Sequence, residues 1–208
     1  MIVATRTVRL LAPIAAVAMV GASGAALAQS DPSLAQVQRS LGATQSLAAN
    51  FIQTDQRNRS LRGTLQLKRP GKVRFAYGDG ANMLMVADGK RLTFIDYDVG
   101  QKSSWGIANS PLSVLLSPQP NLGRIARTIP SGDPRVVLVR ARDARRPEFG
   151  TIIMAFAKSG SAPGGLQLEG WTAIDAQNKR TTVKLDGQRY NVPVPDSAFT
   201  YAEPKRRK

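Results

Sequence analysis

The chain has 208 residues, with 29 lysines and arginines against 14 acidic residues, and its formal net charge is +15 at pH 7. It contains no histidine and no cysteine, which excludes His-dependent triads, thiol nucleophiles, disulfides and ordinary zinc sites. A carboxylate pair is disfavoured as well, because the acidic residues mostly fall at expected turns and strand ends. We therefore expect no enzyme, no metal site and no other cofactor.

The first 28 residues have the three parts of a secretory signal. Arg6 and Arg9 form the charged part, residues 10–20 form the apolar part, and residues 26–28 read Ala-Leu-Ala, an A-x-A cleavage site. The apolar run is about half the ~20 residues that a membrane-spanning helix needs, so a retained anchor is the weaker interpretation. No cysteine follows the site, so we do not expect the protein itself to be lipidated. The pattern predicts export and a mature chain that begins at Gln29.

Cleavage leaves residues 29–208, which we expect to form a single domain. Because the signal holds two arginines and no acidic residue, the mature chain keeps a net charge of +13 of the original +15. Such a surface favours anionic partners, and it also fits a surface that mainly confers solubility. Export and the absence of a recognition-helix or RNP pattern argue against nucleic acid. Residues 202–208 are expected to be a disordered basic tail.

The first half of the mature chain predicts one helix followed by a meander of strands. Residues 32–41 form the helix, with Ser30 or Asp31 as its cap, Pro32 at its first position and Gly42 at its end. The expected strands are residues 47–54, 61–69, 72–77, 83–87 and 91–97, with another around Trp105. A second, short helix covers residues 112–116, with Ser110 as its cap, Pro111 at its first position, and Pro118 and Pro120 after it.

The second half returns to strands, at residues 123–128, 135–141, 150–156, 166–174 and 181–185, with a last short piece that holds Phe199 and Tyr201. Ten or eleven strands and two or three short helices make a mainly β protein. One curved sheet of this size needs its inner face covered, and the two helices are the only candidates. We therefore expect helices inside a half-barrel.

Residues 61–77 contain the most informative pattern. Side chains of a strand alternate between its two faces, so Arg69 points to the same side as Leu65 and Leu67. One interpretation is that Arg69 lies at the rim, reaches solvent and ends the strand. The other is that it is a functional residue that lines an apolar chamber. The helix at residues 112–116, apolar on most of its circumference, similarly predicts either a plain buried helix or a movable lid.

Five segments, in this order and spacing, resemble the family of outer-membrane lipoprotein carrier proteins, LolA, of the bacterial periplasm. They are ANFIQT at 49–54, GTLQLKRPGKVRF at 63–75, VADGKRLTFID at 86–96, SPLSVLL at 110–116 and a late strand at 171–175. The resemblance runs through most of the mature chain. It implies an unclosed antiparallel barrel whose concave apolar face is covered by a helical lid.

The resemblance also implies a function. In this family the apolar cavity takes the acyl chains of a lipoprotein, which comes from an inner-membrane ABC transporter and passes to an outer-membrane acceptor, here a LolB-like protein. The arginine of the KRP turn, Arg69 in this chain, would hold the cavity closed through contacts with the helices and would act in handing the cargo on. The expected location is the periplasm, and the expected state is a monomer.

Alternation and resemblance together give a set of candidate cavity residues. The sheet contributes Phe51, Leu65, Leu67, Val73, Phe75, Tyr77, Leu84, Leu92 and Phe94, and the lid contributes Leu112, Leu115 and Leu116.

Two other hypotheses stay open at this point. The same cavity would serve a carrier of another lipid or of a glycolipid, because acyl pockets select chain volume rather than head group. The second hypothesis is a periplasmic sensor that binds a stray lipoprotein and regulates a membrane-anchored signalling protein. That sensor would favour an extra C-terminal domain, for which the mature chain leaves no room.

Overall fold

The computed structural model describes residues 31–78, 80–107, 112–117 and 121–205. They form one antiparallel sheet of 11 strands in the order β6-β5-β4-β3-β2-β1-β11-β10-β9-β8-β7. The bounds are β1 (Ser46–Asp55), β2 (Ser60–Lys68), β3 (Lys72–Tyr77), β4 (Met83–Asp88), β5 (Arg91–Asp96), β6 (Gln101–Gly106), β7 (Ala126–Ile129), β8 (Val136–Ala141), β9 (Thr151–Lys158), β10 (Leu166–Ile174) and β11 (Arg180–Tyr190). The order ends at β6 and β7, so the sheet is unclosed, and the expectation of a mainly β half-barrel is confirmed.

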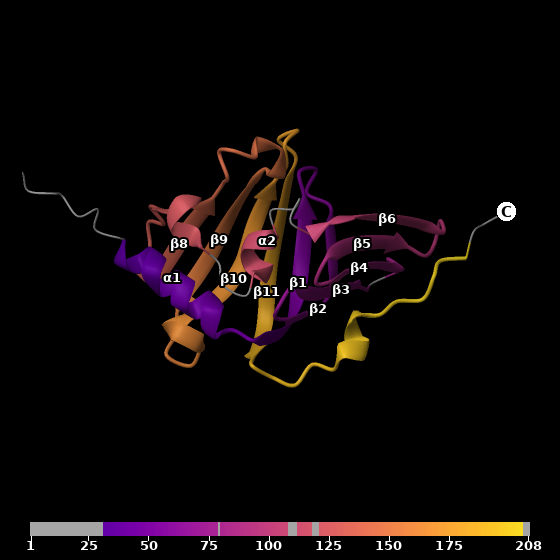
Figure 1. The fold of residues 1–208 in the computed structure, drawn as a ribbon, viewed down its shortest axis with the longest axis horizontal. Helices are drawn as coiled ribbons and strands as arrows, with labels where there is room; N and C mark the ends of the chain where they lie inside the picture. Colours follow the sequence, from indigo (N-terminus) through magenta and orange to yellow (C-terminus); the bar gives the residue numbers. More distant parts are fainter. Residues whose placement is uncertain (1–30, 79, 108–111, 118–120, 206–208) are drawn as a thin grey trace, which may run out of the picture.

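Two α-helices lie against one face of this sheet (Figure 1). In α1 (Pro32–Ala43), the Asp31 carboxylate accepts a hydrogen bond from the Ser33 N–H at 2.9 Å, which caps the helix as expected. The helix continues past Gly42, because the Thr44 N–H and hydroxyl both donate to the Ser40 carbonyl. The second helix, α2 (Ser113–Leu116), is a single turn. The residues expected to bound it, Ser110, Pro111, Pro118 and Pro120, lie outside the described residues, as do the predicted signal at 1–28 and residues 206–208.

Some element boundaries differ from the prediction. The expected strand at 123–128 begins later, because the 3-10 turn η2 (Leu122–Arg124) precedes β7. β11 continues to Tyr190, since it pairs with β1 along its whole length, although its last residues are polar and carry no apolar alternation. The predicted final strand is wrong, because Phe199 ends the 3-10 turn η5 (Asp196–Phe199) and Tyr201 follows it outside any strand.

Two apolar clusters lie on the two faces of the sheet. The larger one fills the space between the sheet and the two helices. The smaller one contains Leu84, Val86 and Ile95, which pack against Val194 and Phe199 of the C-terminal segment. That segment runs along the β2–β4 end of the sheet (Figure 1), and Asp196 in it accepts from Lys68 and Lys72 at 2.8 and 3.0 Å. Among the described helices, none is long and apolar enough to cross a membrane.

The remaining short turns connect strands. They are η3 (Pro147–Phe149), before β9, and η4 (Pro163–Gly165), which lies between β9 and β10. In η4, a Cβ on Gly164 would lie 2.7 Å from the Ser40 Cα, so only glycine lets this turn approach α1. The turn thereby fixes the end of α1 against β10.

Gly63 gives a test of how closely β2 is packed. A Cβ at this position would lie 2.1 Å from the Ala76 carbonyl oxygen and 2.8 Å from a ring carbon of Phe51. Gly63→Ala should therefore lower the free energy of unfolding by about 2 kcal/mol, the usual cost of overpacking. Gly42→Ala is the matched control, since nothing lies within 4 Å of a Cβ there, and in a helix it should raise stability by roughly 0.5 kcal/mol. Urea unfolding measures both values, and equal stability of Gly63→Ala and wild type would contradict the packing.

Candidate functional site

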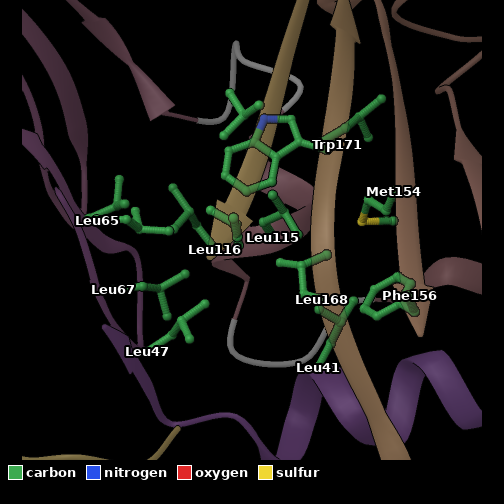
Figure 2. Close-up of a cluster of buried hydrophobic side chains, with 14 of the residues drawn as sticks. Leu41, Leu47, Leu65, Leu67, Leu115, Leu116, Met154, Phe156, Leu168 and Trp171 are labelled. Carbon is green, nitrogen blue, oxygen red and sulfur yellow. The ribbon is translucent and has the colours of Figure 1, made fainter. Parts of the chain in front are cut away.

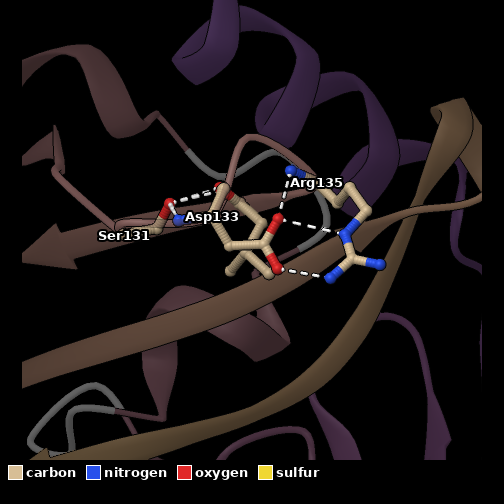
Figure 3. A network of polar contacts seen from close by, with 4 residues as sticks. Ser131, Asp133 and Arg135 are labelled. Atoms are coloured by element: carbon tan, nitrogen blue, oxygen red, sulfur yellow. Dashed lines mark hydrogen bonds and ion pairs between the residues drawn. The ribbon is translucent and has the colours of Figure 1, made fainter.

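The inner face of the half-barrel is filled by side chains of α2. Leu115 and Leu116 are each 4% exposed, and they lie between two rows of apolar side chains from the sheet (Figure 2). One row comes from β1 and β2 and includes Leu47, Leu65 and Leu67. The other row comes from the β9–β10 side and includes the residues labelled Met154, Phe156, Leu168 and Trp171 in Figure 2. We call residues 112–117 the lid, and the apolar space that it fills the interior.

Most of the residues predicted to line the cavity meet in this interior. Eight are buried there: Phe51, Leu65, Leu67, Val73, Phe75, Leu92, Leu115 and Leu116. Tyr77 and Leu112 are partly buried against them. Phe94 is half-buried and lies opposite Ser103 of the terminal strand β6, on the same face as Leu92.

Leu84 was also expected in this set, but it packs in the smaller cluster with Val86 and Ile95. The residues of β4 that pack against the interior are Met85 and Ala87. The strand is apolar on both faces, because the C-terminal segment covers its outer face. Alternation alone therefore gives no sign of which side Leu84 takes.

The prediction also missed several residues that line the interior. Leu41 of α1, Leu47 of β1 and the β9–β10 side chains Phe156, Leu168 and Trp171 line it together with the predicted residues. Their signal was present in the sequence as the alternation of apolar residues at 152, 154 and 156 and at 166 and 168. Which strands face the lid depends on the sheet order, where β11 joins β1 to β10.

Little empty space remains inside the closed molecule. One void of about 20 Å³ is lined by residues that include Phe75, Leu116 and Trp171. A second void of about 20 Å³ lies near Leu41, Arg69 and Phe156. Such a volume has room for about one water molecule and is far too small for an acyl chain. The lid side chains therefore occupy the space that a ligand would need, and a ligand can enter only if the lid moves.

Arg69 connects the ends of the two helices. It follows β2 directly, is 8% exposed and points inward, as the alternation predicts. Its Nε donates to the carbonyl of Thr44 at 2.7 Å, which is the C-cap of α1. Its Nη1 donates to the carbonyl of Ser117, the C-cap of α2. Carbonyls at helix C-termini carry partial negative charge, so both are favourable acceptors for a guanidinium.

The backbone around Arg69 holds the same parts together. The Arg69 N–H donates to the Gln45 carbonyl at 2.8 Å, and the Gly71 N–H donates to the Leu116 carbonyl at 3.1 Å. The turn after β2 thus contacts the lid through both a side chain and the main chain. Opening of the lid has to break the bonds to Leu116 and Ser117.

The charge on Arg69 is not paired with any carboxylate that the structure describes. Burial lowers its pKa to about 10, so the side chain remains a cation at neutral pH. In the part of the chain that the structure describes, no carboxylate forms an ion pair with it. A buried charge is costly unless hydrogen bonds compensate for it, and here carbonyl oxygens supply that compensation. The bond to Ser117 therefore stabilises the closed lid and is lost when the lid moves away.

Tyr77 brings a second polar group to the interior. Its hydroxyl donates to the Gln53 Oε1 at 2.9 Å, and burial raises its pKa to about 12, so it stays neutral. Its ring packs edge-on against Phe51 with the ring centroids 5.2 Å apart. The hydroxyl is thus satisfied, and the interior around it remains apolar.

Fold and site together define a class of architecture: a half-barrel whose apolar inner face is covered by helices that a single buried arginine joins. In the described part of the chain, no group of three or more metal-ligating side chains occurs.

Comparison with known proteins places the chain in a family. Residues 42–202 match the family model of the outer membrane lipoprotein carrier protein LolA, and the chain belongs to this family. An outer-membrane lipoprotein carrier protein of Chromobacterium violaceum is 27% identical over 203 residues, which cover 94% of this chain and 95% of the relative. One from Legionella pneumophila strain Corby is 27% identical over 183 residues, covering 81% and 85%. Among solved structures, a LolA superfamily protein of Nitrosomonas europaea is 11% identical, with a TM-score of 0.47 and coverage of 81% and 97%.

The Arg69 contacts predict how fast the lid opens. The natural chain has no cysteine, so Leu115→Cys provides a unique buried thiol that a maleimide can reach only when the lid opens. Adding Arg69→Leu should accelerate labelling about tenfold or more, because it removes the charge-assisted bond to Ser117 of the lid, worth roughly 1.5–3 kcal/mol.

The matched control places the thiol elsewhere in the core. Ile95 of β5 is fully buried in the smaller cluster on the other face of the sheet, so Ile95→Cys reports loosening of the sheet instead of opening of the lid. Its labelling rate should stay unchanged in the Arg69→Leu background. Equal acceleration at both positions would mean that Arg69 stabilises the whole fold and does not specifically hold the lid.

Proposed function

We propose that this protein is a periplasmic carrier that binds the acyl chains of lipoproteins released from the inner membrane and transfers them to the outer membrane. The observation that carries the proposal is the buried Arg69, which joins both helix ends over an apolar interior filled by the lid. Membership of the LolA family and the names of the relatives support it. The family is one of carriers rather than enzymes.

The physical problem of such a carrier is release. Burial of one methylene gains about 0.8 kcal/mol, so one 16-carbon chain gains roughly 13 kcal/mol when it leaves water. Two or three such chains would be bound almost irreversibly in a rigid apolar cavity. A carrier that passes its cargo on therefore needs a competing interaction that is regained when the cargo leaves.

Closure of the lid supplies this competing interaction. Leu115 and Leu116 leave water when they insert between the sheet rows, at roughly 1.5–3 kcal/mol per side chain. Arg69 regains its bond to Ser117, at roughly 1.5–3 kcal/mol for a charge-assisted bond. The total is roughly 5–9 kcal/mol, which offsets much of the gain from one acyl chain. Lid and cargo therefore exchange on the same surface, and transfer to an acceptor needs no ATP.

The partners follow from this role. An inner-membrane ABC transporter would supply the lipoprotein, and an outer-membrane acceptor, LolB-like in its task, would receive it. The signal-like segment at residues 1–28 supports export to the periplasm. The carrier itself would act as a monomer, since the whole interior is built from one chain.

Trp171 allows a direct test of acyl binding. The chain has two tryptophans, so Trp105→Phe leaves Trp171 as the only one, 5% exposed and 6.1 Å from the Phe75 ring centroid. A synthetic diacylated lipopeptide with brominated acyl chains should quench its fluorescence in a saturable way, because the chains would lie against the ring. The same lipopeptide without bromine is the control. Binding of the brominated probe without quenching would place the acyl chains outside the interior.

Arg69→Leu tests the transfer step. This variant should still accept cargo but fail to pass it on, because closure no longer regains the Arg69 bond to Ser117. Native mass spectra of protein purified from its own periplasm should then show more adducts of acylated-polypeptide mass for the variant than for wild type. Arg62→Leu is the matched control, since Arg62 is an exposed arginine of the same strand on its other face.

The adduct masses also separate the alternatives. Adducts in the mass range of free lipids would favour a carrier of another lipid or glycolipid. Equal loading of Arg69→Leu and wild type would contradict the role of Arg69 in release, even if the cargo is a lipoprotein.

A further inference from the structure

Four arginines line one groove at the end of the sheet. Arg124 of η2, Arg127 of β7, Arg140 of β8 and Arg142 just after β8 surround a volume of about 470 Å³. The neighbouring residues Val139 and Ala141 are buried in the interior, so alternation directs Arg140 away from it. The groove is therefore separate from the acyl-chain site. We call it the arginine groove.

The charges of the arginine groove are not neutralised by described residues. Arg127 and Arg140 are directly opposite each other in the β7–β8 register, an arrangement that destabilises a sheet for like charges. None of the four guanidinium groups forms an ion pair with a described carboxylate. The carboxylate that follows Arg142, Asp143, is instead paired with Arg146 at 2.9 Å. The groove thus concentrates positive charge at a cost in stability, which an anionic partner would offset.

The shape of the groove favours a protein segment over a membrane surface. Binding to a bilayer usually combines basic residues with exposed apolar side chains, and the exposed large apolar residues of the described chain lie elsewhere: Ile52, Val99, Trp105 and Tyr201. The groove is concave, and it includes residues of β7, the last strand of the sheet, whose outer edge pairs with no other described strand. Extended peptides add to such edges, and arginine recognises carboxylates with two parallel bonds.

We propose that the arginine groove docks an extended acidic segment of a partner protein. Its position gives this docking a consequence for the lid. Ile125 lines the arginine groove and also a neighbouring hollow of about 230 Å³, whose other walls include Ser113, Val114 and Ser117 of the lid. A partner bound in the groove would lie beside the lid. The docking does not depend on the proposed function, whereas any effect of the partner on the lid does.

Binding of an acidic peptide tests the docking. The probe is a fluorescein-labelled decapeptide of alternating glutamate and valine, and the readout is fluorescence anisotropy of the exported, cargo-free protein. Arg127→Gln/Arg140→Gln should weaken binding about tenfold or more, and a second variant of the same groove, Arg124→Gln/Arg142→Gln, should reproduce the loss. Both should unfold at no lower temperature than wild type, because they remove like-charge repulsion.

The matched control removes two exposed arginines elsewhere, in Arg57→Gln/Arg180→Gln, which should weaken binding less than threefold. Equal losses in groove and control variants would assign the binding to the overall charge and overturn the proposal. Vesicles of phosphatidylglycerol in phosphatidylcholine are the second probe. If their binding depends on the groove more strongly than peptide binding does, the partner is a membrane surface and the proposal is wrong. These binding experiments contain no acyl cargo, so neither result bears on the proposed carrier function, which the lipopeptide and transfer experiments test.

Discussion

The structure depends on one buried cation whose side-chain partners among the described residues are carbonyl oxygens. Arg69 reaches the interior because it continues the inward row of Leu65 and Leu67, and it meets the C-caps of both helices there. A carboxylate in the same place would form a more permanent pair, whereas the Ser117 carbonyl forms a contact that is lost when the lid moves. The position of the lid, and through it the space available inside, is thus coupled to a single side chain.

This arrangement explains how the interior can be tightly packed and yet depend on a lid that is weakly held. The interior has the composition of a hydrophobic core, but its central layer comes from a four-residue helix with few partners of its own. A single turn of helix is unstable in isolation, so the lid depends on the burial of its leucines and on its bonds to the turn after β2. Under the proposed function, an acyl chain that replaces these leucines would offer the sheet the same apolar contacts. The arginine groove is separate from this exchange, although it shares one wall with the hollow beside the lid.

Local patterns predicted much of this architecture, and long-range pairing accounts for what they missed. The N-cap of α1, the strands of the first half and the inward direction of Arg69 follow from residues close in sequence. Leu84 could not be assigned to a face, because both faces of β4 are apolar. The residues that cover its outer face, Val194 and Phe199, lie more than a hundred positions later in the chain. The inner face of β9 and β10 and the opposition of Arg127 and Arg140 likewise required the sheet order and register.

The central claim is that the lid and an acyl chain exclude each other, and the amide of Gly71 reports on this directly. Its N–H is bonded to the Leu116 carbonyl of the lid at 3.1 Å, whereas the Gly78 N–H, bonded to the Arg62 carbonyl at 2.8 Å, reports on the sheet. Hydrogen exchange followed by NMR should show Gly71 protected in the free protein and exposed once a diacylated lipopeptide is bound, with Gly78 protected in both states. Full protection of Gly71 in the loaded protein would show that the lid stays closed over its cargo, and would contradict the account.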